Sequence, residues 1–406
     1  MSATGITVAV VGLGFGQDFV PLYLRHPQVA GVVLVEPDEE RRREAAARFG
    51  LDAGYSGLDD ALGDPKVDAV HILAPVFLHA DMVVAALEAG KHVACAVPMA
   101  TTLDDIDRII AAAERSGLTY MMMETAVFAR EYFAVRDMHS AGELGALTLY
   151  RGFHVQNLDG YPPYWQGFPP MHYVTHALAP ILALLGTSVL SVSCRGAGRL
   201  TAERRAGGFE NPFPAEVGLF ALRDSDVVAD VTMSFFQTAR SAIEGFSLYG
   251  ERRGVEWAPA YGGPLTVYDM SGPERGERGN RVDVAQLHPA GRTETLPESL
   301  RPFVQPTRAR FSATGDPVRV EAYHGGSHPH LVHEFVSAVI ERRPSVIGPR
   351  EAATWTAPGI CAHLSALRGG AAVPVPQYLA VREPDPLCGN RSRLPHSGSG
   401  SRGRTP

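Results

Sequence analysis

The chain has 406 residues, of which 45% are hydrophobic and 20% are charged, with a formal net charge of -7. This length allows two ordinary domains, and this balance excludes a membrane or fibrous protein. Nucleic acid is not an expected partner, because there is no basic excess to neutralise phosphates. The four cysteines form no Cys-x-x-Cys pair, which argues against a disulfide framework or a thiolate metal site and suits a reducing cytoplasm. No basic region or long apolar run precedes the first strand, so no secretory signal is expected.

The first 125 residues alternate short β-branched runs with helical patterns, the rhythm of a parallel sheet with helices on both faces. Strands are predicted at residues 6–11, 32–35, 69–73, 92–94 and 119–123. A helix is predicted over residues 78–89, where apolar residues recur at helical spacing and stop at Gly90. Thr102 is predicted to cap a further helix that ends near Ser116 and Gly117. We therefore expect a doubly wound α/β domain at residues 1–125.

A glycine-rich turn directly follows the first predicted strand. It consists of Gly12, Leu13, Gly14, Phe15 and Gly16. Glycines there permit a tight turn and let backbone amides approach a pyrophosphate at the start of a helix, although the third glycine is one residue early for the standard fingerprint. Glu36 ends the second strand, where a carboxylate can bind the adenosine ribose and repel a 2′-phosphate. The pattern predicts a Rossmann domain that binds NAD rather than NADP; the alternative is a plain turn beside a solvated strand end.

After residue 125 the pattern changes to a helix and then long strand-like runs. The helix is predicted at residues 129–141, and the strands at residues 146–155, 189–196, 216–222, 227–236 and 246–250. Consecutive strands of this kind predict an antiparallel sheet. Residues 270–322 have little periodicity and are interpreted as a long excursion near the site or a mobile insert. Residues 126–381 are expected to form an α+β domain, and residues 382–406, rich in Pro, Ser, Gly and Arg, a disordered tail.

Several segments resemble the Gfo/Idh/MocA family, the group of glucose-fructose oxidoreductase and inositol dehydrogenase. They are residues 11–16, Ala74-Pro75 with His79, residues 89–93, Pro98, and residues 142–145. The resemblance implies a C-terminal domain with a large, mainly antiparallel open-faced sheet, and a sugar or cyclitol in the cleft between the domains. It also implies that NAD lies at the carboxyl ends of the Rossmann strands. Ala74, Pro75 and His79 would then lie along the nicotinamide half of the cofactor, with Pro98 also among the cofactor-binding residues.

Two motifs depart from the family pattern. The family's Glu-Lys-Pro, whose lysine usually touches the reacting hydroxyl, is Ala96-Val97-Pro98 here, which leaves no charged group at that position. The family's Asp, four residues before a His, is replaced by His172, while His176 is retained. One branch of the family, the NAD-dependent α-N-acetylgalactosaminidases, is more similar to this version. It also lacks the lysine and carries Tyr-x-Thr-His, here Tyr173, Thr175 and His176.

His176 is the first candidate for a catalytic base, because a histidine has a pKa near working pH and can accept the proton of a secondary alcohol. It precedes the helical run 177–185, so its ring is expected at a helix N-terminus, where the dipole keeps it neutral. The alternative is that it only caps this helix. Tyr173 and His172 lie within one turn and are candidates to relay this proton or to take a second one; the alternative for each is packing at the domain interface.

Polar side chains beside aromatic ones follow a predicted strand and suit carbohydrate binding, although surface strands can look similar. The candidates are His154, Gln156, Tyr164 and Trp165. Further along, Gly325 and Gly326 are expected to shape a loop at the cleft, with His324 or His328 touching the substrate. No metal site is expected in this histidine-rich stretch, because His-Glu-x-x-His lacks its second histidine and no cysteine is near.

Three functions are compatible with these patterns. The first is an NAD-dependent dehydrogenase or reductase acting on a secondary hydroxyl of a sugar, glycoside or cyclitol. The second is a redox glycosidase, in which NAD transiently oxidises C3, Tyr173 or His176 removes the C2 proton, and the aglycone is eliminated. The third is a non-catalytic NAD-binding regulator, motivated by the replaced lysine and aspartate. A homodimer or homotetramer through the open sheet face is also expected.

Overall fold

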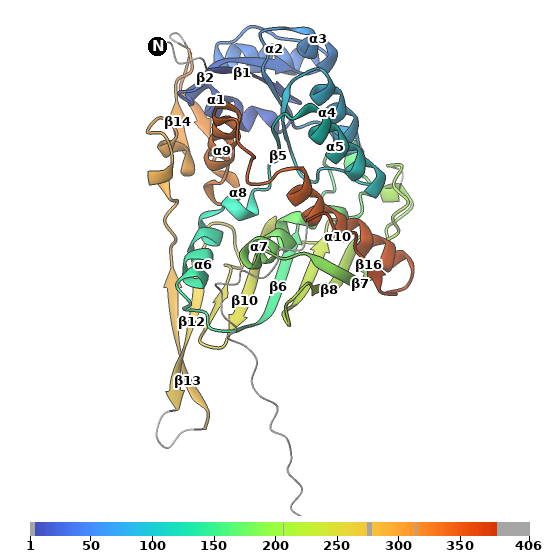
Figure 1. Cartoon of the computed structure of the whole chain (residues 1–406), viewed down its shortest axis with the longest axis vertical. Helices are drawn as coiled ribbons and strands as arrows, with labels where there is room; N and C mark the ends of the chain where they lie inside the picture. The colour runs from blue at the N-terminus through green and yellow to red at the C-terminus, as the bar shows by residue number, and fades with distance from the viewer. Residues whose placement is uncertain (1–4, 206, 274–277, 313–314, 380–406) are drawn as a thin grey trace, which may run out of the picture.

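The computed structural model describes residues 5–379, except residues 206, 274–277 and 313–314. Two sheets organise this part of the chain, one in the upper and one in the lower half of Figure 1. The tail predicted at residues 382–406 lies outside the described residues. Among the helices described, none combines the length and the apolar character needed to cross a membrane.

The N-terminal sheet has five parallel strands in the order β2-β1-β3-β4-β5. They are β1 (Ile6–Val11), β2 (Val29–Val35), β3 (Ala69–Ile72), β4 (His92–Cys95) and β5 (Tyr120–Met122). The side chains of β1, β3, β4 and β5 are almost all buried, because helices cover the sheet on both faces. The predicted parallel sheet is confirmed, and β2 begins earlier than predicted.

Five helices accompany this sheet. They are α1 (Val20–Arg25), α2 (Glu39–Phe49), α3 (Leu58–Gly63), α4 (His79–Glu88) and α5 (Leu103–Ser116). The ends of α5 follow from its sequence: the Thr102 hydroxyl accepts a hydrogen bond from the Asp105 amide at 3.1 Å, and Gly117 ends the helix in the left-handed region at φ +65°. Figure 1 shows α4 and α5 packed together, with α1 on the other side of the sheet.

The second sheet has nine strands in the order β13-β12-β11-β10-β6-β9-β8-β7-β16. They are β6 (Leu147–Val155), β7 (Val189–Ala197), β8 (Ala215–Leu222), β9 (Val228–Ser234), β10 (Ile243–Gly250), β11 (Arg253–Glu256), β12 (Leu265–Pro273), β13 (Asn280–Leu287) and β16 (Val373–Pro374). The large, mainly antiparallel sheet is confirmed. One neighbouring pair, β6 with β9, is parallel, because a crossover that includes a helix separates these strands in the chain.

The two faces of this sheet differ. α7 (Thr175–Leu185) and α10 (Pro349–Leu367) pack on one face, with α6 (Arg130–Ser140) beside α7. Tyr150 of β6 anchors α7, because its hydroxyl donates a hydrogen bond to the Ala177 carbonyl at 2.6 Å. The opposite face exposes Leu149, Leu219 and Val228. The homodimer or homotetramer expected through this face stays a prediction.

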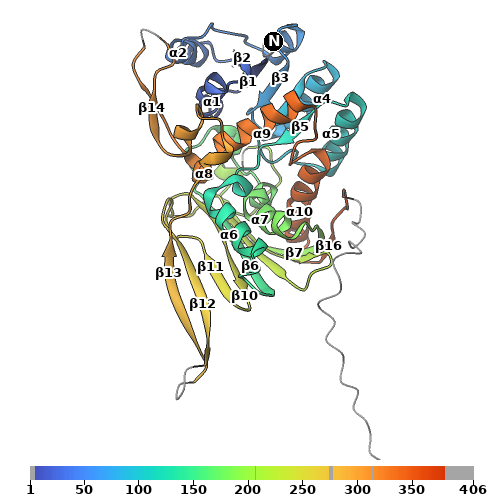
Figure 2. The ribbon, with the colours of Figure 1, turned by 60° about the vertical axis from the view of Figure 1, so that its left-hand side comes forward.

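Residues 270–322 differ from the sequence interpretation. Their described part contains strand pairs rather than a structureless excursion: β12 pairs with β13, and β14 (Thr307–Ala309) pairs with β15 (Val318–Val320). Figure 2 shows the β12–β13 hairpin extending beyond the rest of the sheet. β13 is exposed along nearly its whole length, so burial imposes no pattern on its sequence. Its strand conformation depends on hydrogen bonding to β12.

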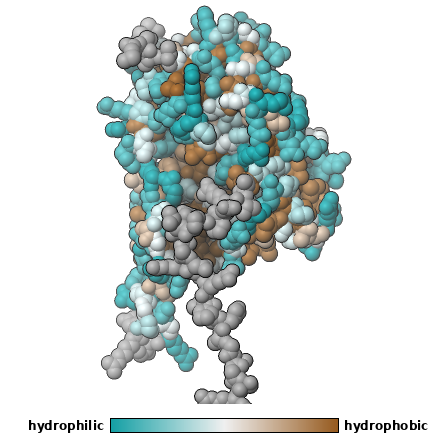
Figure 3. Space-filling view, viewed as in Figure 1, coloured by the Kyte–Doolittle hydropathy of each residue, from teal (hydrophilic) through white to brown (hydrophobic). Residues whose placement is uncertain are grey.

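The last helices return to the N-terminal sheet. α8 (Tyr323–Gly326) leads into α9 (His328–Glu341), which packs on α1, while α10 contacts α5 and β5 as well as β7. The end of the described chain therefore ties the two sheets together. In Figure 3, hydrophilic residues cover most of the upper part, and apolar residues gather in the middle of this face.

Candidate active site

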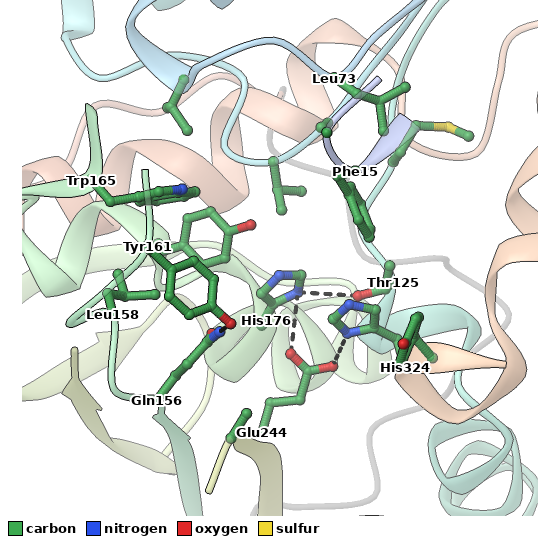
Figure 4. Close-up of a pocket in the computed structure, with 18 of the residues that line it drawn as sticks. Phe15, Leu73, Thr125, Gln156, Leu158, Tyr161, Trp165, His176, Glu244 and His324 are labelled. Carbon is green, nitrogen blue, oxygen red and sulfur yellow. Dashed lines mark hydrogen bonds and ion pairs between the residues drawn. The ribbon is translucent and has the colours of Figure 1, made fainter. Parts of the chain in front are cut away.

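A cavity of about 670 Å³ lies between the two sheets. One wall comes from the segments that follow β1, β3, β4 and β5, and the other from β6, β10, α7 and the residues before α9. Figure 4 shows residues of both walls. Ligands of doubly wound sheets bind outside the carboxyl ends of the strands, so this cavity is where a cofactor and a substrate would meet.

The glycine turn lines the cavity at the end of β1. Gly12 has φ +90°, and a Cβ atom there would lie 2.7 Å from the Leu73 carbonyl oxygen, so only glycine fits. An added Cβ on Gly14 would meet nothing within 4 Å, and Gly14 and Phe15 line the cavity. The turn therefore leaves open space beside its backbone, as a bound pyrophosphate requires. Gly16 packs inward against Val10.

Glu36 holds this turn from the end of β2. Its Oε2 atom accepts a hydrogen bond from the Leu13 amide at 2.7 Å, and its Oε1 atom accepts one from the Asp38 amide at 3.2 Å. Arg41 also pairs with Oε1 at 3.3 Å. Glu36 is buried rather than a solvated strand end. Its predicted contact with an adenosine ribose stays a proposal.

His79 joins the segments that follow β3 and β4. Its Nδ1 atom lies 2.8 Å from the Pro98 carbonyl and its Nε2 atom 3.0 Å from the Ala74 carbonyl. Burial lowers its pKa, partly offset by these two carbonyls. Ala74 and His79 line the cavity, whereas Pro75 and Pro98 do not. His79 thus links the segments that follow β3 and β4 on this side of the cavity.

His176 is the second residue of α7 and lies on the opposite wall, as Figure 4 shows. Its Nδ1 atom donates a hydrogen bond to Oε1 of Glu124 at 2.7 Å, and Oγ1 of Thr125 lies 3.2 Å from the same nitrogen. Oε2 of Glu244 lies 3.9 Å away. Three segments far apart in the sequence therefore surround one buried imidazole.

The protonation of His176 differs from the sequence expectation. Burial lowers its pKa, but the carboxylates of Glu124 and Glu244 outweigh burial and raise the pKa to about 9. Two full charges within 4 Å act more strongly than the partial charge of a helix end. The expectation of a neutral imidazole at working pH was wrong, because the sequence showed the helix start but not the two carboxylates.

A second carboxylate–imidazole pair faces the same cavity. Nδ1 of His324 donates to Oε1 of Glu244 at 2.6 Å, and the rings of His324 and His176 stack with centroids 5.6 Å apart (Figure 4). Burial alone would raise the pKa of Glu244, but the neighbouring imidazoles lower it well below its usual range. His324 adopts φ +51°, a strained conformation for a residue with a side chain. The glycine loop predicted here is observed, since Gly325 and Gly326 also have positive φ.

The predicted substrate-binding residues on β6 and its following loop also line the cavity. Nε2 of His154 donates to Oε1 of Gln156 at 3.2 Å, and Nε2 of Gln156 donates to the Tyr161 hydroxyl at 2.8 Å. Burial lowers the pKa of His154 to about 4, so its ring is neutral at working pH. Tyr164 and Trp165 complete this wall, with ring centroids 5.7 Å apart.

Tyr173 and His172 have different surroundings although they are adjacent in the chain. Tyr173 lines the cavity, and its ring lies 5.0 Å from that of His176; burial, then Glu124 and Glu244, raise its pKa, so its hydroxyl stays protonated. His172 points away from the cavity and packs edge-on against His363. Burial lowers the pKa of His172 to about 3. Its predicted proton relay is therefore not supported, because no cavity surface reaches its ring.

His328 also differs from expectation. Its ring stacks on Phe19 with centroids 4.4 Å apart and meets the edge of Phe15. It is buried behind these rings and does not line the cavity. Of the two histidines predicted to touch a substrate here, only His324 is in reach of one.

Three residues of the site, Glu124, Thr125 and Glu244, were not predicted from the sequence. Glu124 follows a run of three methionines, and Glu244 interrupts an apolar strand, so an isolated acid in an apolar segment was the available signal. Strand β10 was predicted to begin at residue 246, which left Glu244 outside it.

His154, His176 and Glu244 each offer one atom within 4.8 Å of the others, a spacing that could hold a metal ion. His176 and Glu244 have closer partners, Glu124 at 2.7 Å and His324 at 2.6 Å. These contacts form a hydrogen-bonded acid–base network.

The fold and this cavity define a Rossmann-type dinucleotide-binding protein with an attached open-sheet domain. Residues 6–124 match the model of the Gfo/Idh/MocA family, under the description "Oxidoreductase family, NAD-binding Rossmann fold". The resemblance predicted from the motifs is confirmed. The N-terminal domain is accordingly an NAD-binding Rossmann domain.

Two curated relatives illustrate the range of the family. The uncharacterized oxidoreductase ORF334 of Rhizobium meliloti is 33% identical over 147 residues, which are 35% of this chain and 43% of that protein. A glycosyl hydrolase family 109 protein of Streptomyces niveus is 25% identical over 416 residues, covering 92% of this chain and 77% of that protein. The chain thus spans less than half the length of the first relative.

Among solved structures, a levoglucosan dehydrogenase in complex with NADH and levoglucosan is similar in fold. Its TM-score is 0.71 at 19% identity, and the match covers 92% of this chain and all of that chain, 100%. This likeness extends over both sheets and concerns the fold alone.

Proposed function

We propose that the protein is an NAD-dependent oxidoreductase that acts on a secondary hydroxyl of a sugar, glycoside or cyclitol. One observation carries the proposal: His176, hydrogen-bonded to buried Glu124, lines the same cavity as Gly14 and Phe15 of the glycine turn. A proton acceptor and a dinucleotide turn in one cavity are what alcohol oxidation requires. The levoglucosan dehydrogenase of similar fold, solved with NADH and a sugar derivative, supports the substrate class.

The residues present fit the cofactor. Gly14 leaves open space for a pyrophosphate, Glu36 would contact the ribose, and Ala74 and His79 line the cavity. Bound NAD would accept the hydride of the substrate carbon. Gln156 and His154 would bind neighbouring hydroxyls, and the buried walls would exclude water.

His176 would move the hydroxyl proton. Its Nδ1–H group donates to Glu124, which leaves Nε2 to accept the proton during oxidation and to return it during reduction. Because the pKa of His176 is about 9, most rings are protonated at neutral pH and can donate a proton during reduction. Oxidation requires the fraction of the protein in which the ring is neutral.

A second candidate is a redox-elimination glycosidase. Two observations favour it: Glu244 and His324 add a second acid–base pair beside His176, and the glycosyl hydrolase family 109 relative aligns over most of the chain. Transient oxidation of C3 would acidify the C2 proton, a second base would remove it, and the aglycone would leave before water adds. Steady-state NADH accumulation distinguishes a dehydrogenase from this cycle, which releases aglycone without net change of cofactor.

The test is hydride transfer by the full chain with NAD and a panel of cyclitols and pyranosides, followed at 340 nm. His176→Ala should lower kcat by about 10²–10⁴-fold and leave NADH affinity within about twofold. His139→Ala is the matched control, since His139 is a partly buried histidine near the end of α6 and outside the cavity. NADH binding without hydride transfer to any panel member, in the wild type, would favour the non-catalytic regulator instead.

A further inference from the structure

Exposed aromatic side chains gather at the mouth of the cavity. Five of them line it and are each 37% to 55% exposed: Phe15, Tyr161, Tyr164, Tyr261 and Tyr323. We call these five residues the aromatic collar. In the part of the chain that the structure describes, the other aromatic exposed to this extent is Phe77, which does not line the cavity. Large exposed apolar groups gathered at one opening mark a surface that a ligand covers.

The collar comes from four separate segments and is held in position. The Tyr161 hydroxyl accepts a hydrogen bond from Gln156, and the Tyr261 hydroxyl accepts one from the Gly325 amide at 3.3 Å. Tyr164 rests against Trp165. Rings fixed in this way can stack on a flat partner with little loss of rotamer entropy.

Polar groups occupy the base of the cavity rather than its mouth. His154 and His176 are almost completely buried, and the side chain of Glu244 is 11% exposed. A sugar ring therefore finds its hydrogen-bonding partners at the base, next to His176. Whatever the sugar carries on its outward side lies among the rings of the collar.

The charges that line the cavity disfavour an anionic ligand. Asp18 and Glu244 line it, Glu124 lies directly behind His176, and none of the described lining residues is lysine or arginine. The imidazolium of His176 is already paired with Glu124. A carboxylate or phosphate on the substrate would lose water and gain no free cation.

From these placements we infer that the substrate is an uncharged glycoside whose aglycone is an aromatic ring system, with the sugar at the base of the cavity and the aglycone stacked in the aromatic collar. The inference rests on the proposed function and narrows its substrate class. Stacking in the aromatic collar requires an aromatic aglycone. The described lining residues offer no free cation, which requires an uncharged sugar.

The experiment is isothermal titration of the NADH-loaded full chain with matched glycosides. The probes are the methyl and 4-nitrophenyl α- and β-pyranosides of glucose, galactose and N-acetylgalactosamine, together with 4-nitrophenyl glucuronide. For each sugar that binds, the 4-nitrophenyl glycoside should bind at least about tenfold more tightly than the methyl glycoside, as one good aromatic contact contributes. The glucuronide should bind at least about tenfold more weakly than the glucoside.

Two collar variants and one control locate the effect. Tyr261→Ala and Tyr323→Ala should each reduce the affinity for the 4-nitrophenyl glycoside about 5- to 10-fold and leave the methyl glycoside within about twofold. Phe77→Ala, which removes an exposed aromatic outside the cavity, should change neither affinity. Equal affinities for the aryl and methyl probes, preference for the glucuronide, or no glycoside binding by NADH-loaded protein would each overturn the inference. Hydride transfer to a free cyclitol in those cases would leave the proposed function intact.

Discussion

The pKa of His176 is set by opposing effects, burial on one side and two carboxylates on the other. The carboxylates prevail, so the imidazole is mainly protonated below pH 9. Oxidation needs the neutral ring and reduction needs the charged one. The two directions of the proposed reaction should therefore have opposite pH dependence, with kcat/KM for oxidation rising up to about pH 9 and that for reduction falling above it.

Glu124→Gln tests this balance. Removing one carboxylate lowers the pKa of His176, since an opposite charge at this distance is worth about one to three pKa units. The oxidation profile should move to lower pH by that amount, because the neutral ring then forms earlier; pH profiles of kcat/KM and histidine ¹³C NMR measure the shift. Glu88→Gln, on the surface of α4, is the control. An unshifted profile in Glu124→Gln would mean that another group is the proton acceptor.

Gly12 and Gly14 should respond differently to alanine although only one residue separates them. Gly12→Ala forces a Cβ into the Leu73 carbonyl at φ +90° and should lower the free energy of unfolding by about 2–3 kcal/mol. Gly14→Ala meets nothing within 4 Å, so stability should hold while NADH affinity falls. Urea unfolding and NADH fluorescence titration separate the two effects. Unchanged NADH affinity in Gly14→Ala would count against a pyrophosphate at this turn.

At the scale of elements, α5 shows how far local chemistry determines a helix. Thr102 and Gly117 mark its ends in the sequence and in the structure. Thr102→Ala should lower the free energy of unfolding by about 1 kcal/mol, because the Asp105 amide loses its partner. Thr102→Ser keeps a hydroxyl and should restore most of this loss in denaturant titrations. Equal stability of the Ala and Ser variants would show that the cap contributes nothing.

The β12–β13 hairpin shows the opposite case. Its outer strand is defined by hydrogen bonds to β12, and solvent covers both its faces. The sequence of a single strand does not identify the strand with which it pairs. Periodicity therefore predicted only a long irregular segment here. The same limit hid the parallel pairing of β6 with β9, which depends on the path of the chain between them.

For the molecule as a whole, buried histidines predict acid sensitivity. Burial lowers the pKa of His26 and His154 to about 4 and that of His71 and His172 to about 3. A histidine whose pKa is lower in the folded state than in the unfolded state stabilises the protein fully above the unfolded-state pKa, near 6.5. This contribution is lost as the pH falls towards the folded-state pKa. Each group should cost about 2 kcal/mol at pH 5 relative to pH 7. His176, with its raised pKa, acts in the opposite sense and loses its contribution as pH rises through 9.

Urea midpoints at pH 5, 7 and 9.5 measure this dependence, and stability should be greatest near neutral pH. His172→Phe removes one buried titrating ring beside Phe168. The loss of stability between pH 7 and pH 5 should therefore be about 2 kcal/mol smaller in this variant than in the wild type. A midpoint that does not change between pH 7 and pH 5 would contradict the assignment of these rings as neutral and buried.

The sequence by itself determined the local features of this protein. Alternation of strand and helix patterns indicated the Rossmann sheet, the glycine spacing after the first strand indicated the turn, and His176 was predicted at a helix start. These features depend on neighbours within a few residues, which any sequence displays. The family motifs extended the expectation to the open second sheet.

Only the tertiary structure decided the chemistry around His176. Glu124, Glu244 and His324 come from separate segments and meet within a few ångströms of its ring. Charge interactions act through space, so their sign and strength depend on the folded arrangement and not on the order of residues along the chain. For the same reason His172, a predicted site residue, faces the protein interior, while Glu244, which no sequence pattern indicated, faces the cavity.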